Sequence, residues 1–197
     1  MLTEETDMNV YENCPVLENP RWLMRLVEKS DAADLLEVYS DKRALPYFNS
    51  DNCDGDNFYY PTIDRMNDAL DFWIQSYETE WFVRWAIIDK NISKAIGTIE
   101  SFHRPYREDF GEVGVIRLDV GSEYEKADTL KEIFELFVPK AYEFFDCSEI
   151  ITKIPNYAVE RAEAAESFGF ERTDKCLVGD DGYAYNGYWT ITKGSQA

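Results

Sequence analysis

The feature that most constrains the fold is an alternation of strand and helix patterns in the second half of the chain. Glu112–Val120 (EVGVIRLDV) is an apolar run of strand length, and Glu149–Ile154 (EIITKI) is a second, shorter one. Between them, Thr129–Phe145 carries apolar residues at helical spacing, and Tyr157–Phe168 is another helix pattern that ends at Gly169. Two strands joined through a helix lie parallel, because the helix carries the chain back to the end of the sheet where the first strand began. The sequence therefore predicts a locally parallel strand pair.

The rest of the chain predicts two helices and an antiparallel meander beside this unit. The turn at Asp89–Asn91 suits a hairpin, and the antiparallel strands make the sheet mixed. The expected order is strand, helix, helix, three strands, helix, strand, helix, strand, which is an α/β fold with a central mixed sheet and helices on both faces. The further expected elements are strands over Arg21–Glu28, Trp81–Ile88, Lys94–Phe102 and Tyr183–Thr192, and helices over Ser30–Tyr39 and Thr62–Tyr77.

Length and composition favour a single globular domain. The chain has 197 residues, 45% of them hydrophobic and 15% aromatic, which is enough to bury a substantial core. We expect residues 21–197 to form this domain and the acidic residues 1–20 to form a loose arm or an extra edge element. The apolar runs are too short to span a bilayer, and the N-terminus lacks a signal-peptide pattern. The four cysteines are scattered, which favours free thiols in the cytoplasm: Cys14, Cys53, Cys147 and Cys176.

The net charge of −19 restricts the class of partner. It argues against nucleic acid, whose phosphates require clustered Lys and Arg, and it favours either a cationic amine or a plain solvated surface. The loop from Tyr47 to Pro61 contains Asp51, Asp54 and Asp56, a hint of a cation site. No carboxylate stands where a calcium loop closes, so we expect a solvated acidic loop instead.

Four local motifs carry a resemblance to a known family over residues 21–192. They are RLVEKSDAADLLEVYSD, KAIGTIESF, LDVGSEYEKADTLKEIF and AESFGFER. With the element order, they resemble the GNAT N-acetyltransferase superfamily, in particular the branch that acetylates ribosomal-protein N-termini and polyamines. The resemblance implies an acetyl-CoA-dependent N-acetyltransferase acting on a primary amine of a small molecule or a protein N-terminus, with a homodimer as the common assembly.

The resemblance also implies where the cofactor binds. Backbone groups at the end of a splayed strand face the pantetheine arm, and the following turn and helix start point N–H groups at the pyrophosphate. The residues placed there are Leu118, Asp119, Val120, Lys126, Ala127, Asp128, Thr129, Leu130 and Lys131.

The cofactor turn departs from the family pattern of Gln/Arg-x-x-Gly-x-Gly/Ala. Glu125 stands at the Gln/Arg position, Asp128 at the first Gly and Leu130 at the second. A carboxylate about 4 Å from a phosphate is repelled by about 4 kcal/mol at an effective dielectric of 20. The run TLKE also reads as a capping box, with Thr129 as the cap and Glu132 reaching back. We therefore expect an internal carboxylate or hydroxyl to compete for the place of an external phosphate.

The resemblance places a general base at Glu112, early on the fourth strand, with Glu100 on the neighbouring strand as the second candidate. His103, expected in a loop, is a weaker one. The family's tyrosine acid falls at Ala165, and the usual Asn falls at Ala158; the substitutes for the acid are Tyr142 and Tyr157. This mismatch sustains a second hypothesis, in which a GNAT-fold protein has lost acetyl transfer and binds a ligand or a protein partner.

Overall fold

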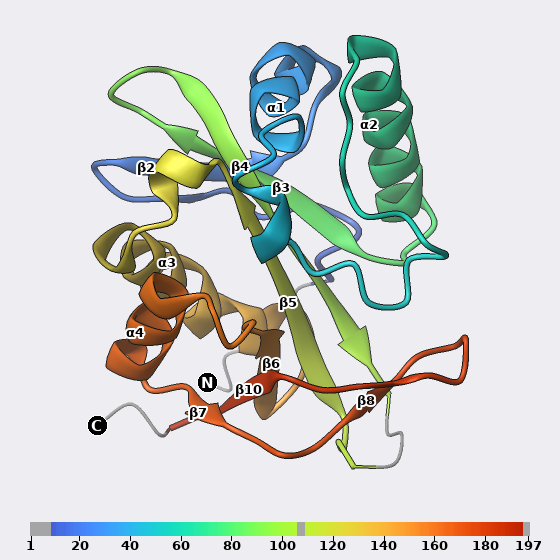
Figure 1. Cartoon of the computed structure of the whole chain (residues 1–197), viewed down its shortest axis with the longest axis vertical. Coiled ribbons are helices and arrows are strands. Elements are labelled where there is room, and N and C mark those ends of the chain that lie inside the picture. Colours follow the sequence, from blue (N-terminus) through green and yellow to red (C-terminus); the bar gives the residue numbers. More distant parts are fainter. Residues whose placement is uncertain (1–8, 106–108, 195–197) are drawn as a thin grey trace, which may run out of the picture.

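The computed structural model describes residues 9–105 and 109–194. An eight-stranded sheet runs in the order β1-β2-β3-β4-β5-β6-β10-β7, with α1 and α2 over one face and α3 and α4 over the other (Figure 1). The helices are α1 (Ala32–Tyr39), α2 (Ile63–Glu78), α3 (Ala127–Phe144) and α4 (Val159–Phe168), with 3-10 turns η1 (Lys29–Asp31), η2 (Leu45–Tyr47) and η3 (Ser122–Tyr124).

The strands follow the predicted order with short additions at the edges. A separate two-stranded sheet pairs β8 with β9. The strands are β1 (Leu17–Glu18), β2 (Trp22–Leu26), β3 (Val83–Asp89), β4 (Lys94–Arg104), β5 (Val113–Val120), β6 (Glu149–Lys153), β7 (Glu171–Arg172), β8 (Leu177–Val178), β9 (Ala184–Tyr185) and β10 (Tyr188–Thr192).

The parallel strand pair predicted from the sequence is present. Within the described residues, β5 and β6 are the only strands that pair in parallel, and their register joins Gly114–Ile116 to Ile150–Thr152. Beyond this register β5 continues through Arg117–Val120, paired with β4 alone, while β6 ends at Lys153. The two strands therefore part, and a crevice opens between their carboxyl ends.

The sheet buries apolar side chains on both faces because alternate residues of its central strands point to opposite sides. Trp85 on β3 packs with Ile133 and Phe137 of α3, all with no exposed surface, while Ala86 joins the core under α1 and α2. The apolar spacing along α3 lies over the sheet as its periodicity predicts.

Two sequence expectations change at the ends of the chain. Of the alternatives for the N-terminal residues, the described part forms an edge element, since β1 pairs with β2 and Val10 is 1% exposed within the core; residues 1–8 lie outside the described part. The closing strand predicted over Tyr183–Thr192 is divided, because Gly187 at φ 83° turns the chain between β9 and β10. Within residues 9–105 and 109–194, no helix combines the length and the apolar character that crossing a membrane demands.

Candidate functional site

Two adjoining cavities lie beside the diverging ends of β5 and β6, and we call them together the crevice. The segment from Pro46 to Asp51, which begins in η2, borders a cavity of about 360 Å³ together with Lys153–Tyr157. The second cavity, of about 300 Å³, is lined by Ser122, Glu125, Lys126 and Glu160, and Tyr47 and Tyr157 line both. The Tyr157 hydroxyl donates to the Pro46 carbonyl at 2.5 Å, and Lys153 Nζ contacts both carboxylate oxygens of Asp51 at 2.6 and 2.7 Å. These contacts tie the loop after α1 to the end of β6.

Arg161 on α4 reaches into the same crevice. Its Nε and Nη2 donate to the two carboxylate oxygens of Glu125, each at 2.7 Å. Its Nη1 donates to the backbone carbonyls of Leu118 at 2.7 Å and Tyr47 at 3.2 Å. Burial lowers the pKa of Arg161, but the charge and hydrogen bonds of Glu125, with a smaller contribution from Asp119, together outweigh this and hold that pKa above its ordinary value. Since Arg161 is 2% and Glu125 6% exposed, the pair is a buried salt bridge across the crevice.

The backbone N–H groups of the bend after β5 are largely satisfied inside the chain. Asp41 Oδ2 accepts from the N–H of Ser122 at 3.2 Å, and Glu160 Oε2 accepts from the N–H of Ala127 at 2.8 Å. The predicted capping box is wrong: α3 begins at Ala127, two residues before Thr129, and Glu132 instead accepts hydrogen bonds from Arg21 and Trp22. The Glu160 carboxylate from α4 therefore accepts from the start of α3, a capping role that we predicted for Thr129.

The predicted cofactor residues divide between the crevice and the core. The Leu118 carbonyl and the Ala127 N–H face the crevice but already bind Arg161 and Glu160. The Asp119 side chain points to the opposite face of the sheet, toward Tyr39. Val120, Thr129 and Leu130 are buried, Lys126 and Asp128 are exposed, and Lys131 is half-buried.

Acetyl-CoA, which the resemblance implies, does not fit these residues in the described conformation. The N–H groups at Ser122 and Ala127 already bind carboxylates, and the Leu118 carbonyl on the free edge of β5 already binds a guanidinium. Glu125 adds a buried negative charge where a pyrophosphate would approach. The chain itself therefore uses the polar groups at Ser122, Ala127 and Leu118 that such a cofactor would need.

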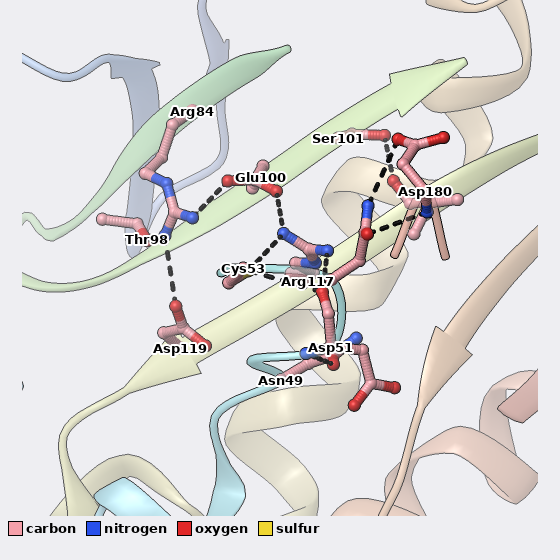
Figure 2. Close-up of polar contacts among 12 residues, drawn as sticks. Asn49, Asp51, Cys53, Arg84, Thr98, Glu100, Ser101, Arg117, Asp119 and Asp180 are labelled. Atoms are coloured by element: carbon pink, nitrogen blue, oxygen red, sulfur yellow. Dashed lines mark hydrogen bonds and ion pairs between the residues drawn. The ribbon is translucent and has the colours of Figure 1, made fainter. Parts of the chain in front are cut away.

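A larger cavity, of about 560 Å³, lies on the α1–α2 face of the sheet; we call it the sheet cavity. Its floor is a cross-strand row in which Arg84 of β3 pairs with Glu100 of β4, and Glu100 pairs with Arg117 of β5. Arg84 Nη2 donates to Glu100 Oε2, and Arg117 Nη1 donates to Glu100 Oε1 at 3.0 Å (Figure 2). Glu100 is thus held between two guanidinium groups.

A second carboxylate supports this floor from the neighbouring row. Asp119 Oδ2 accepts from Arg84 Nη1 at 3.1 Å and from the Tyr39 hydroxyl at 2.9 Å (Figure 2 shows Asp119 beside Thr98). Complete burial raises the pKa of Asp119, although the charge of Arg84 opposes the shift. Burial also raises the pKa of Tyr39 well above its usual value. The floor therefore sets two carboxylates, Glu100 and Asp119, against two guanidinium groups, Arg84 and Arg117.

The walls of the sheet cavity are aromatic and its mouth is acidic. Trp73 stacks against Arg84, whose guanidinium carbon lies 4.2 Å from the ring centroid, and the exposed Trp81 stands at the entrance with Glu80. The aromatic walls suit a ligand with an apolar body, and the exposed carboxylates of Asp54 and Glu80 suit a cationic end, although Arg65 and Arg104 also line the cavity. Further lining residues are Asn52, Cys53, Asp56, Phe58, Tyr60, Ala69, Phe72, Phe82, Phe102, Pro105 and Asp180.

The structure separates the two predicted bases. Glu100 lines the sheet cavity, whereas Glu112 lies exposed in the bend before β5 and does not line it. His103 also lines the cavity, but it lies at the exposed end of β4 and not in the loop that the sequence suggested.

The three positions considered for the general acid lie outside the sheet cavity. Ala165 is fully buried in α4, and the Tyr142 hydroxyl donates to the Ile191 carbonyl inside the core. Tyr157 borders the crevice and not the sheet cavity. None of these three positions brings a hydroxyl into the sheet cavity.

The loop from Tyr47 to Pro61 is less solvated than predicted. Asp51 is 8% exposed and binds Lys153, and Asp56 binds Arg65 at 2.6 Å, so the cations beside these carboxylates belong to the chain itself. Asp54 alone of the three is exposed. In the described ranges, no cluster of three or more His, Cys, Asp or Glu side chains has a metal-binding arrangement.

Sequence reasoning missed Arg161 and Glu160, which decide the state of the crevice. The segment around them reads as an Ala- and Glu-rich amphipathic helix, and neither residue matches a family motif. One signal was present: Arg161 is the only basic residue between Ile154 and Phe170. A lone cation on an otherwise acidic helix indicates a specific partner.

No protein-family model and no curated protein sequence matches this chain. Solved structures do match it. A ribosomal-protein-S5-alanine acetyltransferase from Vibrio fischeri is 17% identical with a TM-score of 0.65, covering 93% of this chain and 99% of its own. A GNAT-family acetyltransferase from Bacillus anthracis is 14% identical with a TM-score of 0.64, covering 90% and 98%. A GCN5-related N-acetyltransferase from Brucella melitensis is 16% identical with a TM-score of 0.63, covering 90% and 78%. The chain has the GNAT N-acetyltransferase fold, as the resemblance predicted.

Proposed function

We propose that this chain is an acetyl-CoA-dependent N-acetyltransferase whose acceptor is the primary amine of a small molecule or of a protein N-terminus. The observation that carries the proposal is the combination of the GNAT fold with a large cavity whose floor includes Arg117, at the point where β5 parts from β6. Because Arg161 occupies the Leu118 carbonyl in the described conformation, the proposal requires the Glu125–Arg161 pair to part before the donor lies along the edge of β5.

The acceptor amine enters the sheet cavity. Its mouth carries Asp54 and Glu80, which attract a cation, and its aromatic walls contact the apolar body of the acceptor. The net charge of −19 steers an amine toward the protein and repels nucleic acid. The neighbour named for ribosomal protein S5-alanine supports a protein N-terminus as one acceptor class.

The two predicted carboxylates have different parts in this proposal. Both oxygens of Glu100 accept from arginines, so its first role is to hold Arg84 and Arg117 in place at the cavity floor. Glu112 acts as a base only through a water chain or a movement of the bend before β5, because it lies outside the cavity.

A second candidate function has a specific observation in its favour. The contacts of Glu160 and Arg161 close the crevice with bonds of 2.7 to 2.8 Å, so the fold can bind an amine in the sheet cavity without transferring an acetyl group. In that case the protein is a ligand-binding module built on a transferase fold. Both candidates use the same cavity and differ in whether acetyl-CoA reacts.

Thiol release separates the two candidates. The purified chain is mixed with millimolar acetyl-CoA and, in turn, spermidine, a peptide with a free N-terminal alanine and the same peptide N-acetylated. The transferase proposal expects saturable CoA release with at least one free amine and none with the blocked peptide. If every amine fails, while spermidine or the peptide still raises the melting temperature, the binding module replaces the transferase. If no amine has either effect, both candidates fail.

Matched variants test the cavity. Trp81 is 64% exposed at the mouth, and Ile92 is 52% exposed on the turn between β3 and β4, outside the cavity. Trp81→Ala removes an aromatic contact of about 1–2 kcal/mol, so we expect the amine KM or Kd to rise by about 5–30-fold. Ile92→Ala leaves it unchanged. Equal effects of the two substitutions would place the amine elsewhere.

We also propose a cytoplasmic location, supported by four free cysteines. A homodimer remains part of the proposal through the resemblance alone. Multi-angle light scattering at micromolar concentration measures the mass directly, with 23.0 kDa expected for the monomer.

A further inference from the structure

We infer that α4 is a latch that closes the donor crevice by occupying its polar groups with the chain's own charges. The latch consists of Glu160 and Arg161 on α4 and of their two partners. Glu160 binds Ala127, the first residue of α3, and Arg161 binds Glu125, in the bend before α3. This inference deepens the donor side of the proposed function and rests on it for the identity of the ligand.

Glu160 takes the anion position at the start of α3. Its Oε2 lies 2.8 Å from the Ala127 nitrogen, and its Oε1 lies 3.5 Å from Lys126 Nζ. The hydrogen bond from the Ala127 N–H lowers the pKa of Glu160, with a further contribution from the charge of Lys126, so this carboxylate is ionised. A carboxylate and a phosphate make the same demand on an N–H group at a helix start. One N–H cannot serve both, so a phosphate that binds the Ala127 N–H must displace Glu160.

Arg161, the next residue, closes the other side. All three nitrogens of its guanidinium are engaged, two with Glu125 and the third with the carbonyls of Leu118 and Tyr47. The Leu118 carbonyl belongs to the stretch of β5 that has no partner on the β6 side. The Arg161 guanidinium thus donates to a carbonyl that a ligand lying along the strand would otherwise bind.

The electrostatics of the bend favour the closed state. Asp41, Glu125 and Glu160 all place carboxylates on it, each beside a cation of the chain: Arg43, Arg161 and Lys126 respectively. A pyrophosphate competes with these carboxylates for the cations and the N–H groups, and opening the crevice separates a buried ion pair. Both effects lower the affinity for CoA compared with an open crevice, because only the open fraction of molecules binds.

The decisive experiment measures CoA binding by titration calorimetry, so that it does not depend on turnover. Glu160→Ala vacates the anion position, and Glu163→Ala is the matched control, since it removes the same charge from an exposed position one turn further along α4. We expect millimolar affinity in the unmodified chain, a gain of about tenfold in Glu160→Ala, and a change within about twofold in Glu163→Ala.

A double variant tests the other half of the latch. Glu125→Gln/Arg161→Gln removes both charges together, which avoids leaving one of them buried without a partner. We expect it to bind CoA more tightly than the unmodified chain, with a cooperative melting transition as evidence that it is folded. Micromolar binding by the unmodified chain overturns the latch. So does equal binding by Glu160→Ala and Glu163→Ala, or no binding by any variant.

The latch and the proposed function fail in different ways. If Glu160→Ala binds CoA but releases no thiol from acetyl-CoA with any amine, the latch stands and the transferase falls. If the unmodified chain binds CoA tightly and turns over, the transferase stands and the latch falls.

Discussion

The pair of Glu125 and Arg161 makes a quantitative prediction about stability. Both side chains are almost completely buried. Arg161 donates four hydrogen bonds, two to the Glu125 carboxylate and two to backbone carbonyls. Removing either partner leaves the other as an unpaired buried charge, which costs about 3–5 kcal/mol. For a domain of this size each kcal/mol lowers Tm by about 2–4 °C, so Glu125→Ala and Arg161→Ala should each lower Tm by about 6–20 °C.

The double variant Glu125→Ala/Arg161→Ala should lose less stability than the sum of the losses in the two single variants. Once both charges are gone, no unpaired charge is left buried, and the remaining loss is that of packing and of the bonds to Leu118 and Tyr47. We therefore expect a coupling energy of about 2–3 kcal/mol from urea unfolding at pH 7.

The exposed pair Lys140 and Glu143 on α3 is the control for this cycle. Their charged atoms lie 3.2 Å apart, and both side chains are about half exposed, at 49% and 51%. The same cycle there should give less than about 0.5 kcal/mol. A coupling between Glu125 and Arg161 no larger than that of the exposed pair would refute the idea that a buried ion pair links α4 to the bend.

Three further predictions concern backbone approach, thiol reactivity and pH. Gly97→Ala should strongly lower Tm in a melting experiment, because a Cβ built there lies 2.2 Å from the backbone oxygen of Asp119 and must force β4 from β5. Iodoacetamide at pH 8 should label Cys176 well before Cys147 by peptide mass spectrometry, because burial raises the pKa of Cys147 to about 11; equal labelling rates would contradict the burial. The pKa of Glu160 is lowered by the N–H at the start of α3, so its contribution to stability is present above its unfolded pKa and lost as the pH falls through the folded pKa. Urea unfolding between pH 6 and pH 3 should therefore show a smaller loss in Glu160→Ala than in the unmodified chain, and parallel curves would count against this hydrogen bond.

The fold was predictable because its signals are local or periodic. The apolar runs of β5 and β6 and the helical spacing of α3 each fix an element by themselves, and their order dictates a parallel pair. Boundaries were less predictable: the capping box at Thr129 is a valid local pattern, yet α3 begins earlier because a carboxylate from another helix satisfies its first N–H.

The sequence by itself determined the sheet, the helices and the acidic character of the bend, since these depend on residue type and on neighbours along the chain. Only the tertiary structure decided which charges meet. Glu125 and Arg161 are 36 residues apart in sequence. The cluster of Arg84, Glu100 and Arg117 comes from three strands. No local spacing in the sequence therefore predicts either cluster. The physical reason is that a buried charge is stable only beside an opposite charge. The partner can come from any segment that the fold brings close, however far away it is in the sequence.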